Sequence, residues 1–397
     1  MAQLPAPVRL LVAGTFINKM GGFMMPYLTI VLRREYHLES GQVALLLSSY
    51  GFGAIVSVSV GGFLTDRIGR RRTLLLSLVG SGLLAIAMGA VQSLRAFVPL
   101  LVAFGFLADL YRPASQSILG DLLPSRDRAL GFAALRMSVN LGFATGMAVG
   151  GLLADWSWRW LFFGDGLTTL AFALVIYALI AETRPATPAN AAAGEPARPW
   201  RDPVMWQLML AAIVSAMIFF SHLTVLPLTI IQNAGYPAIA YGLLMGINGL
   251  IIAVVEMSAV HRLRDQRRLR LAALGIALTG LAFGICGMFQ HWSWYLLAVL
   301  LWTLGEILSI PMLMAFLADW APEAARGRYL GMFSATWSIA FMLNPALCLP
   351  LHARLGDARF WPLMLVLSLP AVVVLLHLDV VADRPERLRG LAHAGPR

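Results

Sequence analysis

Long apolar runs separated by short arginine-bearing turns constrain this chain of 397 residues more than any other feature. An α-helix needs about 20 apolar residues to cross the hydrocarbon core of a bilayer. In lipid, only helices and closed barrels satisfy all of their backbone polar groups. We therefore predict an all-α membrane protein with twelve transmembrane helices, at residues 8–32, 41–64, 73–92, 95–120, 129–154, 159–181, 204–231, 237–260, 269–290, 293–318, 327–350 and 358–380.

The composition argues against a soluble protein. Charged residues make up 13% of the chain, whereas soluble domains carry about 25%. The net charge of +10 could suggest a nucleic-acid partner, but the basic residues lie in turns between apolar runs and form no single patch, so we expect none. Cys286 and Cys348 both lie in apolar runs, which predicts neither a disulfide framework nor a metal site.

The segment 182–203 is polar and interrupted by prolines. We interpret it as a cytoplasmic linker between an N-terminal six-helix bundle, residues 1–181, and a C-terminal six-helix bundle with a short tail, residues 204–397. Both termini then lie on one side of the membrane. With the termini in the cytoplasm, 21 arginines fall on the inner side and 6 on the outer side, which predicts a multi-pass protein of a bacterial inner membrane with cytoplasmic termini.

The two predicted bundles are related by an internal repeat. Pro113 and Pro311 are separated by 198 residues, and so are Asp121 and Asp319. Two related bundles around a central site are what alternating access requires, because one bundle can rock against the other.

The turn between the second and third predicted helices carries a charged pattern. It reads GFLTDRIGRRRTL, with its characteristic residues at Gly62, Asp66, Arg67, Gly69, Arg70 and Arg71. We expect Gly62 to permit close helix approach and Gly69 to adopt the backbone angles of a tight turn. We expect Asp66 to accept from a neighbouring helix N-terminus or from an arginine. The pattern resembles the loop signature of the major facilitator superfamily, GxLxDRxGRRxxL, at every fixed position, and the resemblance implies that superfamily's transporter fold.

A second pattern lies in the fifth predicted helix. Gly142, Gly146, Gly150 and Gly151 resemble the antiporter signature of the same superfamily, gxxxGPxxGG, except that Met147 replaces the proline. Small residues on one stripe predict close helix packing. The resemblance implies antiport and a role in closure toward the outside, while the missing proline leaves a plain packing face as the alternative.

Several polar residues fall inside predicted spans. Lys19, the only lysine, lies beside Asn18 near the middle of the first helix. A charge at that depth costs at least about 2.5 kcal/mol, so we expect Lys19 to line a substrate cavity and to have an acidic partner. Asn18, His222 and Asn248 are the other residues predicted for this cavity. A lone histidine is also common as a packing residue.

Three further residues are predicted to couple transport to protons. Glu306 lies at the middle of the tenth helix, where desolvation favours a protonated carboxyl group. Asp109 and Arg112 are i, i+3 neighbours in the fourth helix and can neutralise each other as a structural pair. An arginine at this depth is associated with proton coupling in the superfamily. We prefer Glu306 as the proton carrier.

No ATP-binding loop or catalytic spacing is present in the sequence, so we expect that the protein is not an enzyme and needs no cofactor. We expect a proton gradient to be its energy source. Together, the loop signature, the glycine motif and the polar residues within spans most resemble those of bacterial multidrug/proton antiporters. The resemblance implies proton-coupled efflux of amphipathic or apolar small molecules by a monomer. One alternative is a proton-coupled importer of a small nutrient such as a peptide or siderophore. The other is a membrane receptor or scaffold that does not transport.

Overall fold

The computed structural model describes residues 4–183, 199–263, 265–322 and 326–382. Within these ranges the chain is helical and contains no strand. It divides into two compact units. Unit 1 contains the described residues up to 183 together with Leu223–Ala253 and Pro345–Pro350, and unit 2 contains the other described residues. The predicted linker falls mostly on residues 184–198, outside the described ranges, and the predicted domain boundaries stay a prediction.

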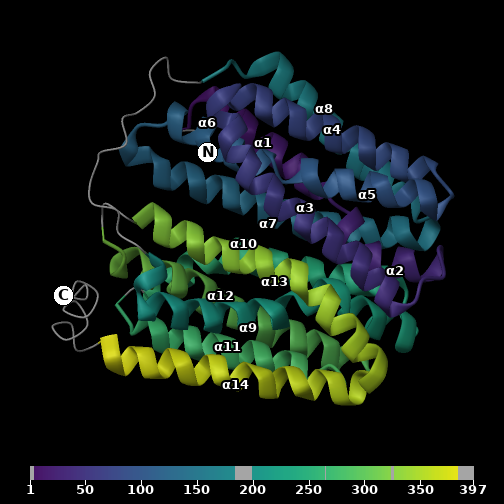
Figure 1. Ribbon diagram of the computed structural model, residues 1–397, viewed down its shortest axis with the longest axis vertical. Coiled ribbons are helices and arrows are strands. Elements are labelled where there is room, and N and C mark those ends of the chain that lie inside the picture. The colour runs from purple at the N-terminus through teal and green to yellow at the C-terminus, as the bar shows by residue number, and fades with distance from the viewer. Residues whose placement is uncertain (1–3, 184–198, 264, 323–325, 383–397) are drawn as a thin grey trace. The chain divides into compact units, whose positions relative to one another are not determined.

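Figure 1 shows the helices in chain order. They are α1 (Ala6–Met20), α2 (Met24–Arg34), α3 (Ser40–Arg67), α4 (Arg70–Ala90), α5 (Leu94–Ala108), α6 (Tyr111–Leu122), α7 (Ser125–Trp156), α8 (Arg159–Leu179), α9 (Pro203–Thr224), α10 (Ala238–Leu263), α11 (Arg268–Ile285), α12 (Trp292–Trp320), α13 (Arg326–Leu355) and α14 (Asp357–Ala382). Two short elements, η1 (Pro199–Arg201) and η2 (Leu228–Asn233), flank α9, and η2 is a π-helix.

Eleven stretches of the described chain are long and apolar enough to span a membrane. The first predicted span, residues 8–32, is not among them and is interrupted, because α1 ends at Met20 and α2 begins at Met24. The prediction of one continuous helix here was wrong. Two successive glycines, Gly21 and Gly22, disfavour continuation of the helix, and the backbone of Gly21 passes so close to Thr168 of α8 that a Cβ would collide with it.

The fourth predicted span is also two helices. The chain leaves the helix at Asp109 and Leu110, between α5 and α6. Pro113 favours a break at this position, because in a regular helix its ring clashes with the carbonyl group four residues earlier, that of Asp109. The predicted seventh helix, residues 204–231, likewise ends early, at Thr224, and is followed by η2.

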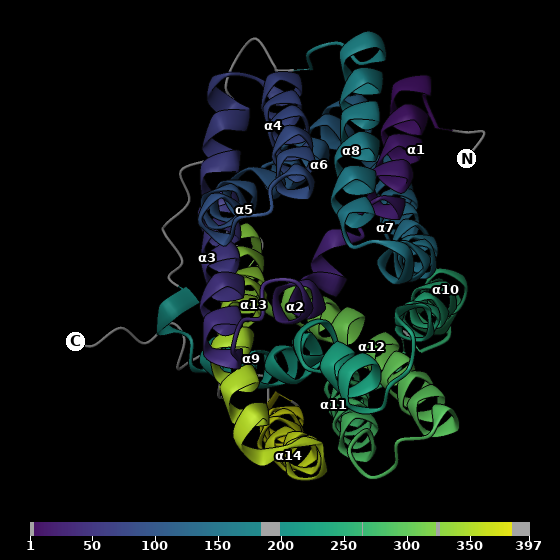
Figure 2. The ribbon, with the colours of Figure 1, turned by 90° about the vertical axis from the view of Figure 1, so that its right-hand side faces the viewer.

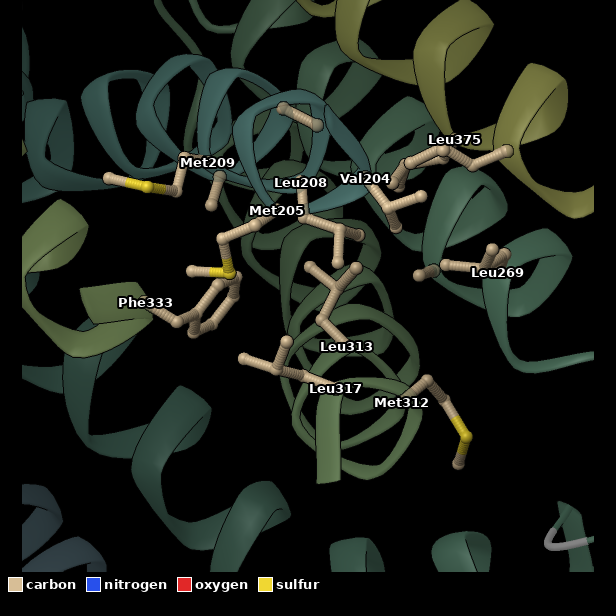
Figure 3. Close-up of a cluster of buried hydrophobic side chains, with 14 of the residues drawn as sticks. Val204, Met205, Leu208, Met209, Leu269, Met312, Leu313, Leu317, Phe333 and Leu375 are labelled. Carbon is tan, nitrogen blue, oxygen red and sulfur yellow. The ribbon is translucent and has the colours of Figure 1, made fainter. Parts of the chain in front are cut away.

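Each unit has its own apolar core. In unit 1, α4 packs on α5 and α8, α1 packs on α7 and α8, and α3 packs on α5 (Figure 2). Unit 2 is built on α11, which packs on both α12 and α14. Figure 3 shows its core, where Leu313 and Leu317 of α12 meet Met205 and Leu208 of α9, with Leu269 of α11 in the same cluster.

Candidate functional site

The signature turn is shorter than predicted. Helix α3 continues to Arg67 and α4 begins at Arg70, so that only Ile68 and Gly69 lie between them. Gly69 has a φ of 108°, a conformation that favours glycine. Asp66 belongs to α3, but its side chain lies outside the described part of the structure, so its role stays a prediction.

Glu182 ties this turn to the end of α8. Its Oε1 accepts the backbone N–H of Arg70 at 2.8 Å and that of Arg71 at 3.4 Å. A carboxylate in this position satisfies free N–H groups and stabilises the positive end of the α4 dipole. A Cβ on Gly69 would collide with the same carboxylate. The Glu182 carboxylate can therefore cap α4 only while residue 69 has no side chain.

The arginines of the turn are bound by the ends of two helices. Arg70 Nε lies 3.0 Å from Asp121 Oδ2 at the end of α6, and Thr183 Oγ1 donates to the same oxygen at 3.1 Å. Arg71 donates to the carbonyl oxygen of Tyr177 in α8 at 2.6 Å. These bonds fix the beginning of α4 against α6 and α8.

A related ion pair is present in the second half of the repeat. Arg268, the first residue of α11, pairs with Asp319 near the end of α12 and also donates to the carbonyl oxygen of Ala315 at 3.0 Å. Arg268 follows Arg70 by 198 residues, the offset that relates Asp319 to Asp121. The sequence interpretation matched the two aspartates and missed the two arginines, although the same offset identifies them.

The expectation for Gly62 was wrong. A Cβ at Gly62 would meet nothing within 4 Å. The close approach occurs one residue earlier, at Gly61, where a Cβ would lie 2.9 Å from Pro113 of α6. Adjacent helical residues differ by about 100° in direction, so a shift of one residue moves the contact to a different helix face.

The glycines of α7 pack against the broken first span. A Cβ at Gly142 would lie 2.7 Å from the carbonyl oxygen of Phe16, and one at Gly146 would lie 2.5 Å from that of Met20. Gly150 approaches Tyr27 of α2 in the same way, at 3.0 Å. Gly151 faces Ile239 at the start of α10.

A second glycine stripe was missed by sequence reasoning. Gly242, Gly246 and Gly249 of α10 approach the backbone of α7 between Asn140 and Met147. Their i, i+4, i+7 spacing is typical of a close helix contact. The contact is accompanied by Asp155, whose carboxylate accepts the backbone N–H groups of Ala238 at 2.8 Å and Ile239 at 3.0 Å and so caps α10.

The break between α1 and α2 is surrounded by polar groups. Asn18 donates to Thr169 Oγ1 at 2.8 Å, and Thr169 donates to Asp165 Oδ1 at 3.4 Å. Asp165 also accepts the backbone N–H of Met24, the first residue of α2. A buried carboxylate of α8 thus caps the second part of the interrupted span.

Lys19 belongs to the same region. Its Nζ lies 4.5 Å from the centre of the Tyr111 ring, on α6. It interacts electrostatically with Asp165, the acid expected on a facing helix. No ion pair of Lys19 occurs among the described residues, so this ammonium group is held by an aromatic face and by a carboxylate beyond ion-pair distance.

Asp109 and Arg112 form the pair that their spacing predicts. Arg112 Nε lies 2.8 Å from Asp109 Oδ1. The side chain of Arg112 is 58% exposed and that of Asp109 is 17% exposed. Tyr50 of α3 interacts electrostatically with both, and also with Asp165 and Tyr111. The structure therefore brings the predicted residues Asn18, Lys19, Asp109 and Arg112 into one polar region of unit 1, and adds Tyr50, Asp165 and Thr169 to it.

The predicted residues Glu306 and His222 belong to unit 2. Glu306 is half-buried on α12, and His222 is buried on α9. The His222 ring lies 4.9 Å from that of Trp302, which precedes Glu306 by one helical turn. Asn248 is buried on α10, in unit 1.

Aromatic side chains gather around His222. Phe219 contacts Trp302 and Trp337, and Phe220 contacts Trp337 and Phe341. Among the described residues, no group of three or more His, Cys, Asp or Glu side chains is arranged to hold a metal ion.

A protein of this kind, with apolar helices of spanning length and ionisable groups inside them, belongs to the class of polytopic helical membrane proteins. The sequence profile of the Major Facilitator Superfamily matches residues 11–345 and 267–392. The chain belongs to this superfamily of transporters.

Relatives and solved structures agree with this assignment. The transporter YttB of Bacillus subtilis is 26% identical over 86% of this chain and 87% of its own length. A Na(+), Li(+), K(+)/H(+) antiporter of Planococcus maritimus is 25% identical, over 87% of this chain and 89% of its own. The crystal structure of a POT family transporter in complex with 5-aminolevulinic acid matches 96% of each chain with a TM-score of 0.80 at 16% identity, a likeness of fold.

Proposed function

We propose that this protein is a proton-coupled secondary transporter that exports amphipathic or apolar small molecules by alternating access. The observation that carries the proposal is the set of ionisable side chains within spans of a superfamily transporter. Charged groups inside membrane spans are costly and mark ion or substrate pathways. Asp109, Arg112, Asp165 and Glu306 are such groups, and Lys19 lies in the interrupted first span.

One relative supports exchange against protons, and another supports an organic solute. The Planococcus maritimus relative is an antiporter of protons against alkali cations. The quinolone resistance protein NorA of Staphylococcus aureus is 24% identical over 39% of this chain and 40% of its own length. Export of an organic compound in exchange for protons is the function that agrees with both relatives and with the apolar composition of this chain.

The aromatic cluster of unit 2 supports an apolar or amphipathic substrate. Phe219, Phe220, Trp337 and Phe341 are each partly exposed rather than fully buried. Aromatic side chains offer large apolar contact areas at low cost in conformational entropy, and they accept substrates of different shapes. Glu306, one helical turn from Trp302, places an ionisable group beside this cluster.

We infer that Glu306 carries the proton, because Asp109 is already paired with Arg112 and Asp165 already caps α2. A carboxyl group that is held in an ion pair or that caps a helix changes its protonation state at higher cost, which argues against Asp109 and Asp165 as the carrier.

The test is transport by purified protein in proteoliposomes with an imposed pH gradient, using a panel of fluorescent amphiphiles. Glu306→Gln mimics the protonated acid and should abolish accumulation driven by the gradient while leaving substrate binding intact. Glu35→Gln, the same chemical change at an exposed residue following α2, is the matched control and should transport normally. Uphill transport by Glu306→Gln with normal pH dependence would move the coupling site to Asp109 or Asp165.

A proton-coupled importer of a small nutrient is the second candidate, because the likeness of fold to the POT family transporter extends over almost the whole chain. The same proteoliposomes distinguish the two functions by the direction of the gradient that drives accumulation.

A further inference from the structure

We propose that Arg112 of α6 and Lys19 of α1 form a binding site for an anionic group, a carboxylate of the transported small molecule. The inference deepens the proposed function by naming a polar end for an amphipathic substrate. It rests on that function for the view that the bound molecule is transported.

The guanidinium group of Arg112 is only partly used. Asp109 engages its Nε, and no hydrogen bond of Nη1 or Nη2 occurs within the described part of the chain. A guanidinium group has five N–H donors and binds carboxylates through two parallel bonds. The side chain is 58% exposed, so an incoming carboxylate can reach the donors that Asp109 leaves free.

The exposed face of α6 is polar although the helix lies mostly within a span. Arg112 and Gln116 lie one turn apart and are both exposed. Ala114 and Ile118 are fully buried. All four residues lie in the stretch Leu94–Leu119, which is apolar and long enough to cross a membrane. A face of this composition is expensive against hydrocarbon and is suited to a water-filled space, so we place Arg112 in contact with water rather than lipid.

Lys19 supplies the second cation. Its ammonium group lies against the ring of Tyr111, the residue directly before Arg112. Lys19 of α1 therefore contacts the turn of α6 that carries Arg112. A cation over an aromatic face keeps its N–H donors available, and no ion pair of Lys19 uses them in the described ranges.

The two acids of the region do not compete for these donors. Asp109 is bound at Arg112 Nε, and Asp165 is satisfied by the N–H of Met24 and the hydroxyl of Thr169. Each acid therefore has donors of its own. The free groups at this place are N–H donors with positive charge, which select an anion over a cation or a neutral amide.

Equilibrium binding to the protein in lipid nanodiscs, without any gradient, tests the site. The probes are dansylglycine, which carries a carboxylate, and dansylglycinamide, its neutral counterpart. Wild-type protein should bind dansylglycine more tightly. Arg112→Gln should weaken dansylglycine binding by about tenfold or more, the loss expected for charge-assisted hydrogen bonds. Binding of dansylglycinamide should stay within about twofold, because the amide makes no such bond.

Three further variants complete the experiment. Lys19→Gln should weaken dansylglycine binding by a smaller factor. Arg112→Lys keeps the charge without the fork and should retain part of the preference. Arg95→Gln removes an exposed arginine at the start of α5 and should change neither affinity. Thermal unfolding of each variant shows that it is folded.

Equal affinity of the wild-type protein for the two probes, including undetectable binding of both, would overturn the inference. Unchanged dansylglycine binding by Arg112→Gln would do the same. The assay contains no proton gradient, so a carboxylate preference that depends on Arg112 can stand even where the proposed coupling through Glu306 fails.

Discussion

Helices α5 and α6 in unit 1 and helix α12 in unit 2 occupy the same place in the repeat, and the charged residues that they share lie at their ends. Asp121 and Asp319 each pair with the first residue of an earlier helix in the same half, Arg70 of α4 and Arg268 of α11. Two pairs with the same offset of 198 residues show that the repeat preserves this junction. It fixes the end of one helix to the beginning of another in each half.

The middle of the two regions is different. Asp109 and Arg112 correspond, at the same offset, to Ile307 and Ile310. Helix α12 continues through Pro311, whereas the chain is broken before Pro113. Charges that are present in one half and absent in the other are not required by the shared fold. This difference is consistent with the role in transport that we propose for Asp109 and Arg112.

The first prediction replaces Asp109 and Arg112 by isoleucine, the residue at both corresponding positions of α12. The double variant Asp109→Ile, Arg112→Ile should fold, because an ion pair whose arginine is 58% exposed contributes at most about 1 kcal/mol to stability. Transport in proteoliposomes should fall by about tenfold or more, because the charges inside the span are lost. The thermal unfolding midpoint provides the control for folding. A double variant that transports normally would show that the charged pair serves only the structure.

The second prediction concerns the turn that precedes α4. Gly69→Ala should lower the free energy of unfolding by about 2 kcal/mol, because alanine is strained at positive φ and its Cβ collides with Glu182. Gly62→Ala is the matched control, since its Cβ has open space in a helix, where alanine is favoured by about 1 kcal/mol over glycine. Chemical denaturation in detergent measures both. If the two variants are equally stable, the turn does not depend on Gly69.

The third prediction compares the two ion pairs directly. The side chains of Arg70 and Asp121 are 13% and 24% exposed, and those of Arg268 and Asp319 are 31% and 69% exposed. Asp121→Ala should therefore lower the free energy of unfolding by about 1–2 kcal/mol, and Asp319→Ala by less than about 1 kcal/mol. Raising the salt concentration should reduce the second effect more than the first. The reverse order of stability would mean that the junction in unit 2 is the stronger one.

Much of the fold follows from the length of the apolar runs, because a bilayer requires helices of a given length. The interruptions follow from local backbone chemistry that an apolar count ignores. Pro113 and the pair Gly21–Gly22 were visible in the sequence and mark both breaks. Hydropathy treats them as ordinary members of an apolar run.

The candidate site was predictable in part. The charges of Lys19, Asp109 and Arg112 stand out in apolar runs, and the i, i+3 spacing predicts the ion pair between two of them. The contributions of Asp165 and Thr169 depend on how α8 packs beside the broken span, which no local pattern specifies. The choice of Gly62 over Gly61 failed for the same reason, because the direction of a neighbouring helix decides which glycine it meets.

Lys19 gives the protein a built-in spectroscopic reporter. Reductive methylation with ¹³C-formaldehyde converts each lysine amine into a dimethylamine, and this sequence offers one lysine besides the terminal amine. The Nζ lies 4.5 Å from the centre of the Tyr111 ring, so the ring current shields the methyl groups attached to it. Separation of the ammonium group from the ring removes that shielding. The one side-chain methyl resonance of the sample therefore reports the distance between α1 and α6, without any substitution in the sequence.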